Sequence, residues 1–493
     1  MSEPPGPTEH GRGARPLRIG GIGLRRDRPD LVWRSASAAA VAEVPVPIGP
    51  GVSVTVDAAD PAMVLGWNIA GDADPAPLLT ACTEDVTTLI DTARSGAARP
   101  AGDPLRLQPS WVRRALVTAV TQRFPAPLHE GALLLDAATA DQGVGDTALA
   151  TATLGWAVPV LDELATAWLD GRITGAAATT LTEVARRCAA AAADIDLGTD
   201  IAAIAERLTV AQAADDAELL REMLESLADA DDSELAFNLG GDAGIGSWPP
   251  GIDEELDLPA VPPRILRWAG AREREIRVVP GTVSGAGNEE SVDIHVRLAA
   301  DVDPLCREAH TLRAYAADGR DGRLLATAAM RPENRILVGQ LQFHRPTDLT
   351  PVFGLYSADL GPALIRSDPT GRALRGVDRL MIDAWISHRA AVVAAATTGP
   401  RSSADLREQL RLRARGMLVR AGSLAATAAE RLDALAERVS AADAELAARL
   451  DARVDAIDRY LLVLEGPATH TPSGMEPLLA EQIPVETDEG ERP

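Results

Sequence analysis

Lysine is absent from the 493 residues of this chain, so all 48 of its Lys and Arg side chains are arginine. Without lysine the chain cannot form the Schiff base of pyridoxal enzymes, and it has no lysine to place on phosphate as P-loop proteins and protein kinases do. The absence therefore excludes these classes. Lysine is normally a common residue. Its loss fits the codon bias of a GC-rich genome or, as the alternative, selection against lysine-directed tagging.

Cysteine and aromatic residues are also scarce. Cys82, Cys188 and Cys306 are too few and too scattered for a disulfide framework or a zinc knuckle, which fits a reducing compartment. An aromatic content of 3% disfavours platforms that stack single-stranded bases. No segment approaches the roughly twenty apolar residues that span a bilayer, and the first residues lack an apolar signal core. The sequence predicts a cytoplasmic protein with no membrane partner.

The charge balance argues against polyanionic partners. The chain carries 72 acidic residues and a formal net charge of −24, so its surface as a whole repels nucleic acid and anionic membranes. Its 46% hydrophobic residues are sufficient for ordinary globular cores. The length predicts two to four domains.

Composition and periodicity divide the chain into seven segments, and the fold class that they predict is multidomain α+β. It combines an N-terminal α-helical bundle, a small antiparallel β-sandwich or barrel, and a long C-terminal helical hairpin or coiled coil. The predicted boundaries are a disordered arm (1–30), short extended elements (31–73), an α-helical domain (74–229), an acidic flexible linker (230–261), an antiparallel β domain (262–358), a C-terminal helical hairpin (359–465) and a disordered acidic tail (466–493).

The C-terminal helices are predicted from two apolar stripes. The first stripe belongs to a helix from about 371. The second continues at intervals of three and four residues, with one stutter, and predicts a single helix from about 403 to 464. The stripes comprise Leu374, Val377, Met381, Trp385, His388 and Val392, and then Leu432, Leu435, Val439, Ala442, Leu446, Leu450, Val454, Ile457, Leu461 and Leu464. We expect the second stripe to be buried against the first helix or in a homodimer.

Cys306 and His310 are the strongest candidates for catalysis. If Asp303 caps a helical turn, the thiol of Cys306 lies near a helix N-terminus, where its pKa is lowered, and His310 follows on the same face as a base. No third orienting group is evident, and a purely structural segment is the favoured interpretation.

The β domain contains candidate metal ligands, Asp293 and His295. Asp293 and His295 lie on one face of a predicted strand, but Arg297 continues the same row, and a cation opposes metal binding. His388, within an apolar stripe, is typical of a hydrogen-bonded core histidine. We therefore predict no metal and no cofactor.

An arginine ridge is predicted on the helix that follows residue 402. Arg407, Arg411 and Arg415 recur at intervals of four residues, and Arg401, Arg413 and Arg420 lie nearby. Such a ridge suits an acidic protein surface, the acidic linker of the same chain, or phosphate. The overall negative charge favours the protein partner.

Together these features predict a non-enzymatic scaffold or adaptor that binds a partner protein through helical surfaces, and a second copy joined through the C-terminal helix is one candidate partner. Two alternatives remain open. One is a cysteine–histidine enzyme centred on Cys306 and His310. The other is a nucleic-acid-binding regulator that uses the ridge of residues 401–420.

Overall fold

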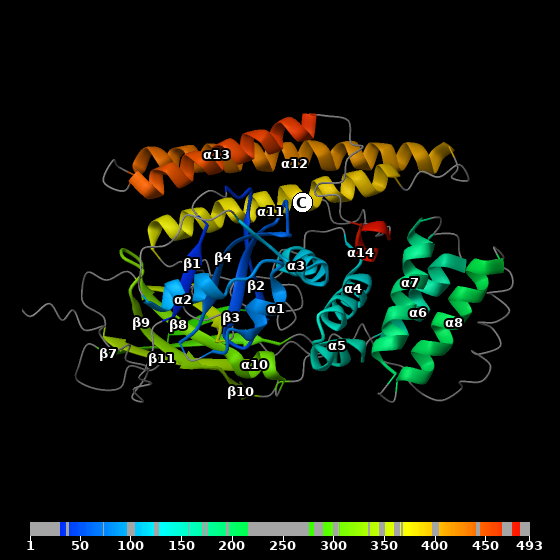
Figure 1. Ribbon diagram of the computed structural model, residues 1–493, viewed down its shortest axis with the longest axis horizontal. Coiled ribbons are helices and arrows are strands. Elements are labelled where there is room, and N and C mark those ends of the chain that lie inside the picture. The colour runs from blue at the N-terminus through cyan, green and yellow to red at the C-terminus, as the bar shows by residue number, and fades with distance from the viewer. Residues whose placement is uncertain are drawn as a thin grey trace, which may run out of the picture.

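The fold of the chain is a mixture of α-helices and antiparallel sheets with long helices towards its C-terminus, as the sequence predicts (Figure 1). The computed structural model describes residues 30–35, 39–71, 73–95, 104–122, 128–155, 157–169, 173, 176–193, 197–214, 276–280, 289–298, 304, 306–333, 336–344, 351–358, 365, 368–396, 404–439, 444–465 and 476–483. The predicted acidic linker, and the predicted arm except for its last residue, lie outside these residues.

The first elements form an antiparallel sheet. Its strands are β1 (Leu31–Arg34), β2 (Glu43–Gly49), β3 (Val52–Asp57), β4 (Met63–Ile69) and β5 (Leu105–Arg106), and its order is β1-β4-β3-β2, with β5 paired to β4. Alternate residues of β2 are buried, because successive side chains of a strand point to opposite faces. Gly51 turns the chain between β2 and β3 with a φ of 71°, which glycine adopts without steric cost. The extended elements predicted over 31–73 thus form one sheet.

In the part of the chain that the structure describes, the helices that follow or interleave with this sheet are α1 (Ala76–Ala81), α2 (Thr87–Ser95), α3 (Pro109–Gln122), α4 (Glu130–Gly143), α5 (Thr147–Leu154), α6 (Ala157–Leu169), α7 (Ala176–Ala191) and α8 (Gly198–Ala214). His129 caps α4, because its Nδ1 accepts the Ala132 N–H at 3.2 Å. Cys82, the residue that ends α1, and Cys188 of α7 are both buried.

The second β region contains two antiparallel sheets. One has the order β10-β11-β7-β6 and the other β12-β8-β9, and the short helix α10 (Arg307–Thr311) precedes β8. A turn that contains Gly322, at a φ of 70°, joins β8 to β9. The strands are β6 (Ile276–Pro280), β7 (Glu289–Arg297), β8 (Leu312–Asp318), β9 (Leu324–Ala329), β10 (Arg331–Glu333), β11 (Ile336–His344) and β12 (Pro351–Ser357).

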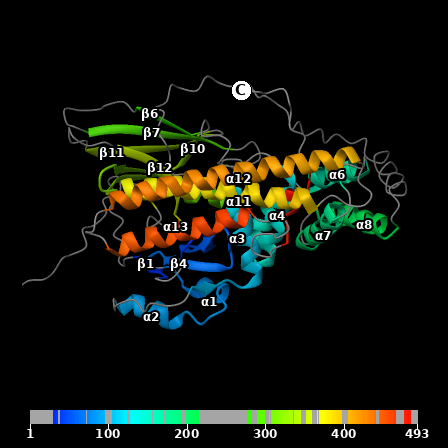
Figure 2. The same cartoon turned by 90° about the horizontal axis from the view of Figure 1, so that it is seen from above.

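The C-terminal helices differ from the predicted two-helix hairpin. The structure has three long helices, α11 (Pro369–Ala396), α12 (Ala404–Arg438) and α13 (Ala444–Glu465), and both α11 and α13 pack against α12 (Figures 1 and 2). The single helix expected from about 403 to 464 was therefore wrong. Residues 440–443, which separate α12 from α13 in the sequence, lie outside the described residues. The apolar stripe continues across the break because both helices face the same core.

The tail predicted to be disordered over 466–493 contains an ordered part. Residues 476–483 are placed, and they include the short helix α14 (Leu479–Gln482). Residues 478–483 are all buried. An octapeptide cannot build a core of its own, so this segment owes its order to the helices around it.

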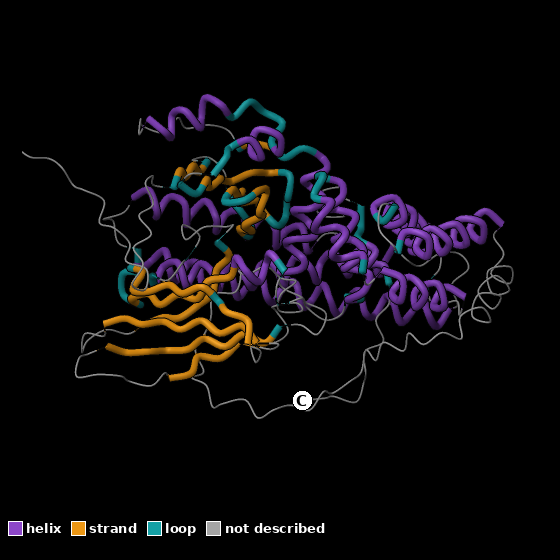
Figure 3. The backbone as a smooth tube through the Cα atoms, turned by 90° about the horizontal axis from the view of Figure 1, so that it is seen from below, coloured by secondary structure: helices purple, strands orange, loops and turns teal. Residues whose placement is uncertain are grey.

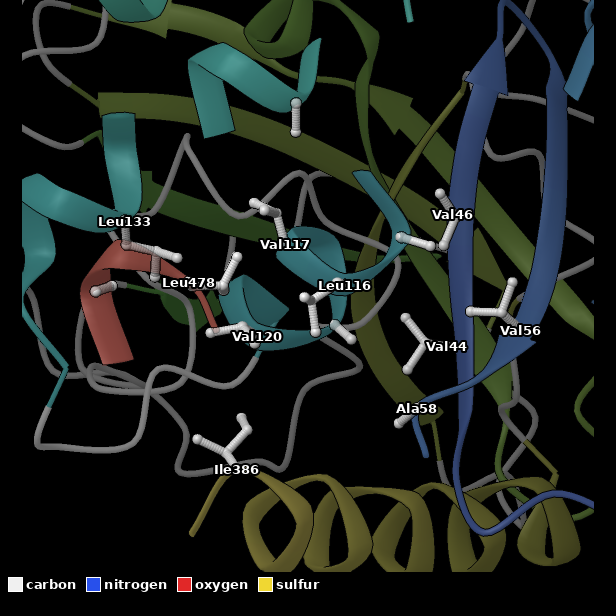
Figure 4. Close-up of a cluster of buried hydrophobic side chains, with 14 of the residues drawn as sticks. Val44, Val46, Val56, Ala58, Leu116, Val117, Val120, Leu133, Ile386 and Leu478 are labelled. Atoms are coloured by element: carbon white, nitrogen blue, oxygen red, sulfur yellow. The ribbon is translucent and has the colours of Figure 1, made fainter. Parts of the chain in front are cut away.

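Two main hydrophobic clusters organise the described residues. The larger runs from Trp33 to Ile483 and joins the first sheet, the N-terminal helices and the C-terminal helices (Figure 4). A second cluster, from Ile276 to Leu355, belongs to the second β region. The larger core crosses the predicted boundaries of the 31–73, 74–229 and 359–465 segments. Figures 2 and 3 show that the two groups of strands lie apart, and in Figure 1 both groups lie beneath the C-terminal helices.

Candidate functional site

The first half of α12 is held on α11 by small and flexible apolar residues. Ala414 of α12 is buried against Ala391 and Ala394 of α11, and Leu410, Met417 and Leu418 pack around them. Alanines on both helices allow close approach of the two backbones. One face of α12 is thereby fixed, and the opposite face is directed away from α11.

The outer face of α12 carries exposed apolar side chains between arginines. Leu412 is 59% exposed and Val419 is 67% exposed. Seven residues are almost two helical turns, so these two side chains lie in line along the helix. Arg411, Arg415 and Arg420 are exposed beside them. We define these five residues as the α12 outer face.

The predicted arginine ridge is therefore placed in part. Arg411 and Arg415 belong to the α12 outer face, whereas the side chain of Arg407 lies outside the described residues. Arg413 points inward, and its burial lowers its pKa. Among the described residues, no acidic side chain lies within 4.0 Å of Arg411 or Arg415. These two positive charges are thus not neutralised by the part of the chain that the structure describes.

A glycine interrupts the α12 outer face. Gly416 lies between Leu412 and Val419, is exposed, and a Cβ at this position would meet nothing within 4 Å. Glycine inside a helix costs about 1 kcal/mol relative to alanine. Packing within the described chain does not require it, so the bare backbone at Gly416 leaves room for the close approach of another molecule.

Beneath α13, a buried ion pair connects the C-terminal helices to the first sheet. Arg453 of α13 pairs with Asp378 of α11 and donates to the Val41 carbonyl at 3.3 Å. The Glu43 N–H donates to Asp378 Oδ1 at 3.0 Å. Buried charges need such partners, because desolvation of an unpaired charge is costly. The pair fixes α13 on α11 and so supports α12, which packs against both.

His388 is a core histidine, as its position in the stripe predicts. Its Nδ1 lies 3.3 Å from the Tyr460 hydroxyl of α13. Burial, and then the positive charge of Arg389, lower the pKa of His388 to about 4. Burial also raises the pKa of Tyr460 above its ordinary value. Both groups are therefore neutral at pH 7 and join α11 to α13.

Cys306 directly precedes the short helix α10, and His310 lies within that helix. The helix begins at Arg307, so Cys306 is itself the N-cap, and the expected capping residue Asp303 lies outside the described residues. The His310 N–H donates to the Cys306 carbonyl at 3.1 Å, which is a backbone contact, and the His310 side chain is exposed. Cys306 is half-buried and packs against the second hydrophobic cluster.

Asp293 and His295 lie on the polar face of β7, as the alternation predicts. Both are half-buried, and Val292, Ile294 and Val296 between and beside them are buried. His295 is the register partner of Arg277 on β6, which adds a second cation to the face that carries Arg297. Within the part of the chain that the structure describes, no group of three or more His, Cys, Asp or Glu side chains could hold a metal ion.

Among the described helices, none is both long enough and apolar enough to cross a membrane. No protein family model, curated protein or solved structure has a significant match to this chain. The interpretation of the α12 outer face therefore depends on its own geometry and chemistry.

Proposed function

We propose that this protein is a non-enzymatic adaptor that binds an acidic partner protein through the α12 outer face. The observation that carries this proposal is the exposure of Leu412 and Val419 in line on a helix, flanked by Arg411, Arg415 and Arg420. Single exposed apolar residues are common, but an apolar row flanked by arginines is typical of protein interfaces. Apolar side chains supply binding energy, and arginine pairs with carboxylates through its planar donors.

The chemistry of the face defines the partner. Leu412 and Val419 suit an amphipathic helix or peptide that places apolar residues in their row. The arginines suit carboxylates at the edge of that partner, and Gly416 permits close backbone approach. Phosphate is the ligand in the nucleic-acid alternative, but two exposed apolar side chains between the arginines contribute nothing to contact with a phosphate backbone.

The experiment compares proteins recovered from an extract of the native host with three tagged chains. These are the wild type, the Leu412→Asp/Val419→Asp variant and the matched Leu462→Asp/Val463→Asp variant, which changes exposed apolar residues of α13. We expect proteins bound by the wild type to be lost with the α12 variant and retained with the α13 variant. Equal recovery with all three chains would overturn the proposal. Recovery that depends on intact nucleic acid would favour the regulator instead.

A further inference from the structure

Residues 476–483, here named the C-terminal segment, pack between helices from distant parts of the chain, and the site that the segment fills is here named the pocket. Helix α14 within the segment contacts α4, α7 and α11. Leu478 lies in the same apolar cluster as Leu133 of α4 and Ile386 of α11 (Figure 4). Leu478, Leu479 and Ala480 are fully buried. The segment therefore enters the pocket with its apolar side chains inward.

The carboxylate of the C-terminal segment has a dedicated receptor. Glu481 accepts two hydrogen bonds from Arg389 of α11, from Nε at 2.5 Å and from Nη2 at 2.7 Å. Both side chains are buried. The guanidinium of Arg389 also lies 5.3 Å from the centre of the Trp385 ring. A planar guanidinium that binds both oxygens of a carboxylate recognises its position and its orientation.

The main chain of the segment is recognised as well. Asp136 of α4 accepts the Ala480 N–H at 3.1 Å and is held by Arg113 of α3, which donates to its other oxygen at 2.8 Å. Arg113 also donates to the Glu476 carbonyl at 3.3 Å. Pocket side chains that bond to backbone groups are characteristic of peptide recognition. The segment thus contacts the pocket as a bound peptide does.

The pocket also recognises the last turn of the segment. The Gln482 side chain and Thr180 of α7 exchange hydrogen bonds at 3.1 and 3.2 Å. The only covalent route from α13 to the segment is the ten residues 466–475, which follow Glu465. Release of the segment consequently breaks pocket contacts but requires no unfolding of α11, α12 or α13.

An empty pocket is unfavourable for a physical reason. Without the segment, Arg389 would remain in an apolar site with no carboxylate, and Asp136 would lose a donor. A second ligand that supplies a carboxylate and apolar side chains restores these contacts. Replacement of the segment by such a ligand is therefore more favourable than release of the segment that leaves the pocket empty.

We propose that the pocket formed by α3, α4, α7 and α11 is a peptide-recognition site that the C-terminal segment occupies in cis. Its partner ligand is a peptide with two adjacent leucines and, after one intervening small residue, a glutamate that pairs with Arg389. The C-terminal segment acts as the tethered competitor of that ligand. This site is separate from the α12 outer face, and it does not depend on the proposed function.

The test uses a fluorescent peptide of residues 474–486 and the full chain. We expect Glu481→Arg in the chain to expel the tethered segment, since two arginines would then meet in the pocket. The variant should bind the free peptide on the order of 100-fold more tightly than the wild-type chain, because a tethered competitor at an effective concentration of about 1 mM opposes a peptide whose Kd is on the order of 10 μM. The matched Glu476→Arg chain should bind as the wild type does, since that side chain is exposed.

A peptide that itself carries Glu481→Arg should not bind any chain. If the Glu481→Arg chain is folded by circular dichroism and still binds the native peptide no better than the wild type, the proposal is wrong. If that variant does not fold, hydrogen exchange on the wild type decides. The Leu478 and Ala480 amides should then exchange faster than the Trp385 amide, and equal rates set by global unfolding would overturn the proposal.

Discussion

Arg389 and Glu481 lie 92 residues apart in the sequence, yet their side chains form a buried two-bond ion pair with atom separations of 2.5 and 2.7 Å. Glu481 also accepts the Leu478 N–H at 2.7 Å, which closes the turn of α14. One carboxylate thus stabilises the local turn and joins it to α11. The chemistry of the pocket and the stability of the chain are linked through this pair.

Glu481→Gln should destabilise the protein. The change removes one charge and leaves Arg389 buried without its counterion, which costs about 3 kcal/mol. Denaturant unfolding of wild type and variant measures the difference in the free energy of unfolding. The exposed Glu476→Gln is the control, and its effect should stay within about 0.5 kcal/mol. Similar effects of both substitutions would contradict the assignment of the buried pair.

Asp57 should make stability depend on pH. Burial raises the pKa of this aspartate to about 6, although the hydrogen bonds that it accepts from the Ala42 and Ala59 N–H groups lower the pKa. The folded state therefore binds this proton more tightly than the unfolded state. The contribution of protonated Asp57 to the free energy of unfolding is about 3 kcal/mol. It is fully present below pH 4 and is lost as the pH rises through 6.

Asp57→Asn removes this contribution. We expect the free energy of unfolding of the variant minus that of the wild type to rise by about 3 kcal/mol between pH 4 and pH 7. His388, whose pKa is lowered to about 4, acts in the opposite sense, since its stability is lost as pH falls. Both proteins contain His388, so its contribution cancels in the difference between their free energies of unfolding. A difference that does not change with pH would refute the expectation.

Two glycine substitutions should have opposite effects. Gly416→Ala adds a methyl group in open space on α12 and should stabilise the fold by about 1 kcal/mol. Gly354→Ala in β12 would place a Cβ 2.5 Å from the Tyr315 ring and should destabilise it. Thermal unfolding of both variants is the measurement. The adaptor proposal adds that Gly416→Ala weakens partner binding although it strengthens the fold.

Cysteine labelling tests the enzymatic alternative. Burial raises the pKa of Cys82 and of Cys188 to about 12, so iodoacetamide at neutral pH should modify the half-buried Cys306 first. Selectivity alone is therefore not diagnostic of catalysis. The informative comparison is His310→Ala, which should leave the Cys306 labelling rate unchanged. A large decrease in that rate would support a cysteine–histidine pair. The Cys306→Ala chain is the control, since its labelling measures the reaction of the other cysteines.

Local periodicity in the sequence was sufficient to predict several elements of the fold. The alternation of Val292, Ile294 and Val296 with polar residues predicts β7, because a strand has a period of two regardless of what covers it. The apolar spacing of Val377, Met381 and Trp385 likewise predicts the buried face of α11. The arginines of the candidate site were also visible in the sequence, since exposure of a charged helix face requires no knowledge of distant contacts.

The break between α12 and α13 and the order of the C-terminal segment required the tertiary structure. Stripe positions on both sides of the break face one core, so the apolar pattern did not distinguish one helix from two. The composition of residues 466–493 predicted disorder, because a short acidic segment cannot bury enough surface alone. Its order depends on Arg389 and Asp136, which are separated from it by long stretches of sequence. Composition and periodicity determined the local elements. Burial of the C-terminal segment was determined only by the tertiary structure, because its partners come from helices that are distant in the sequence.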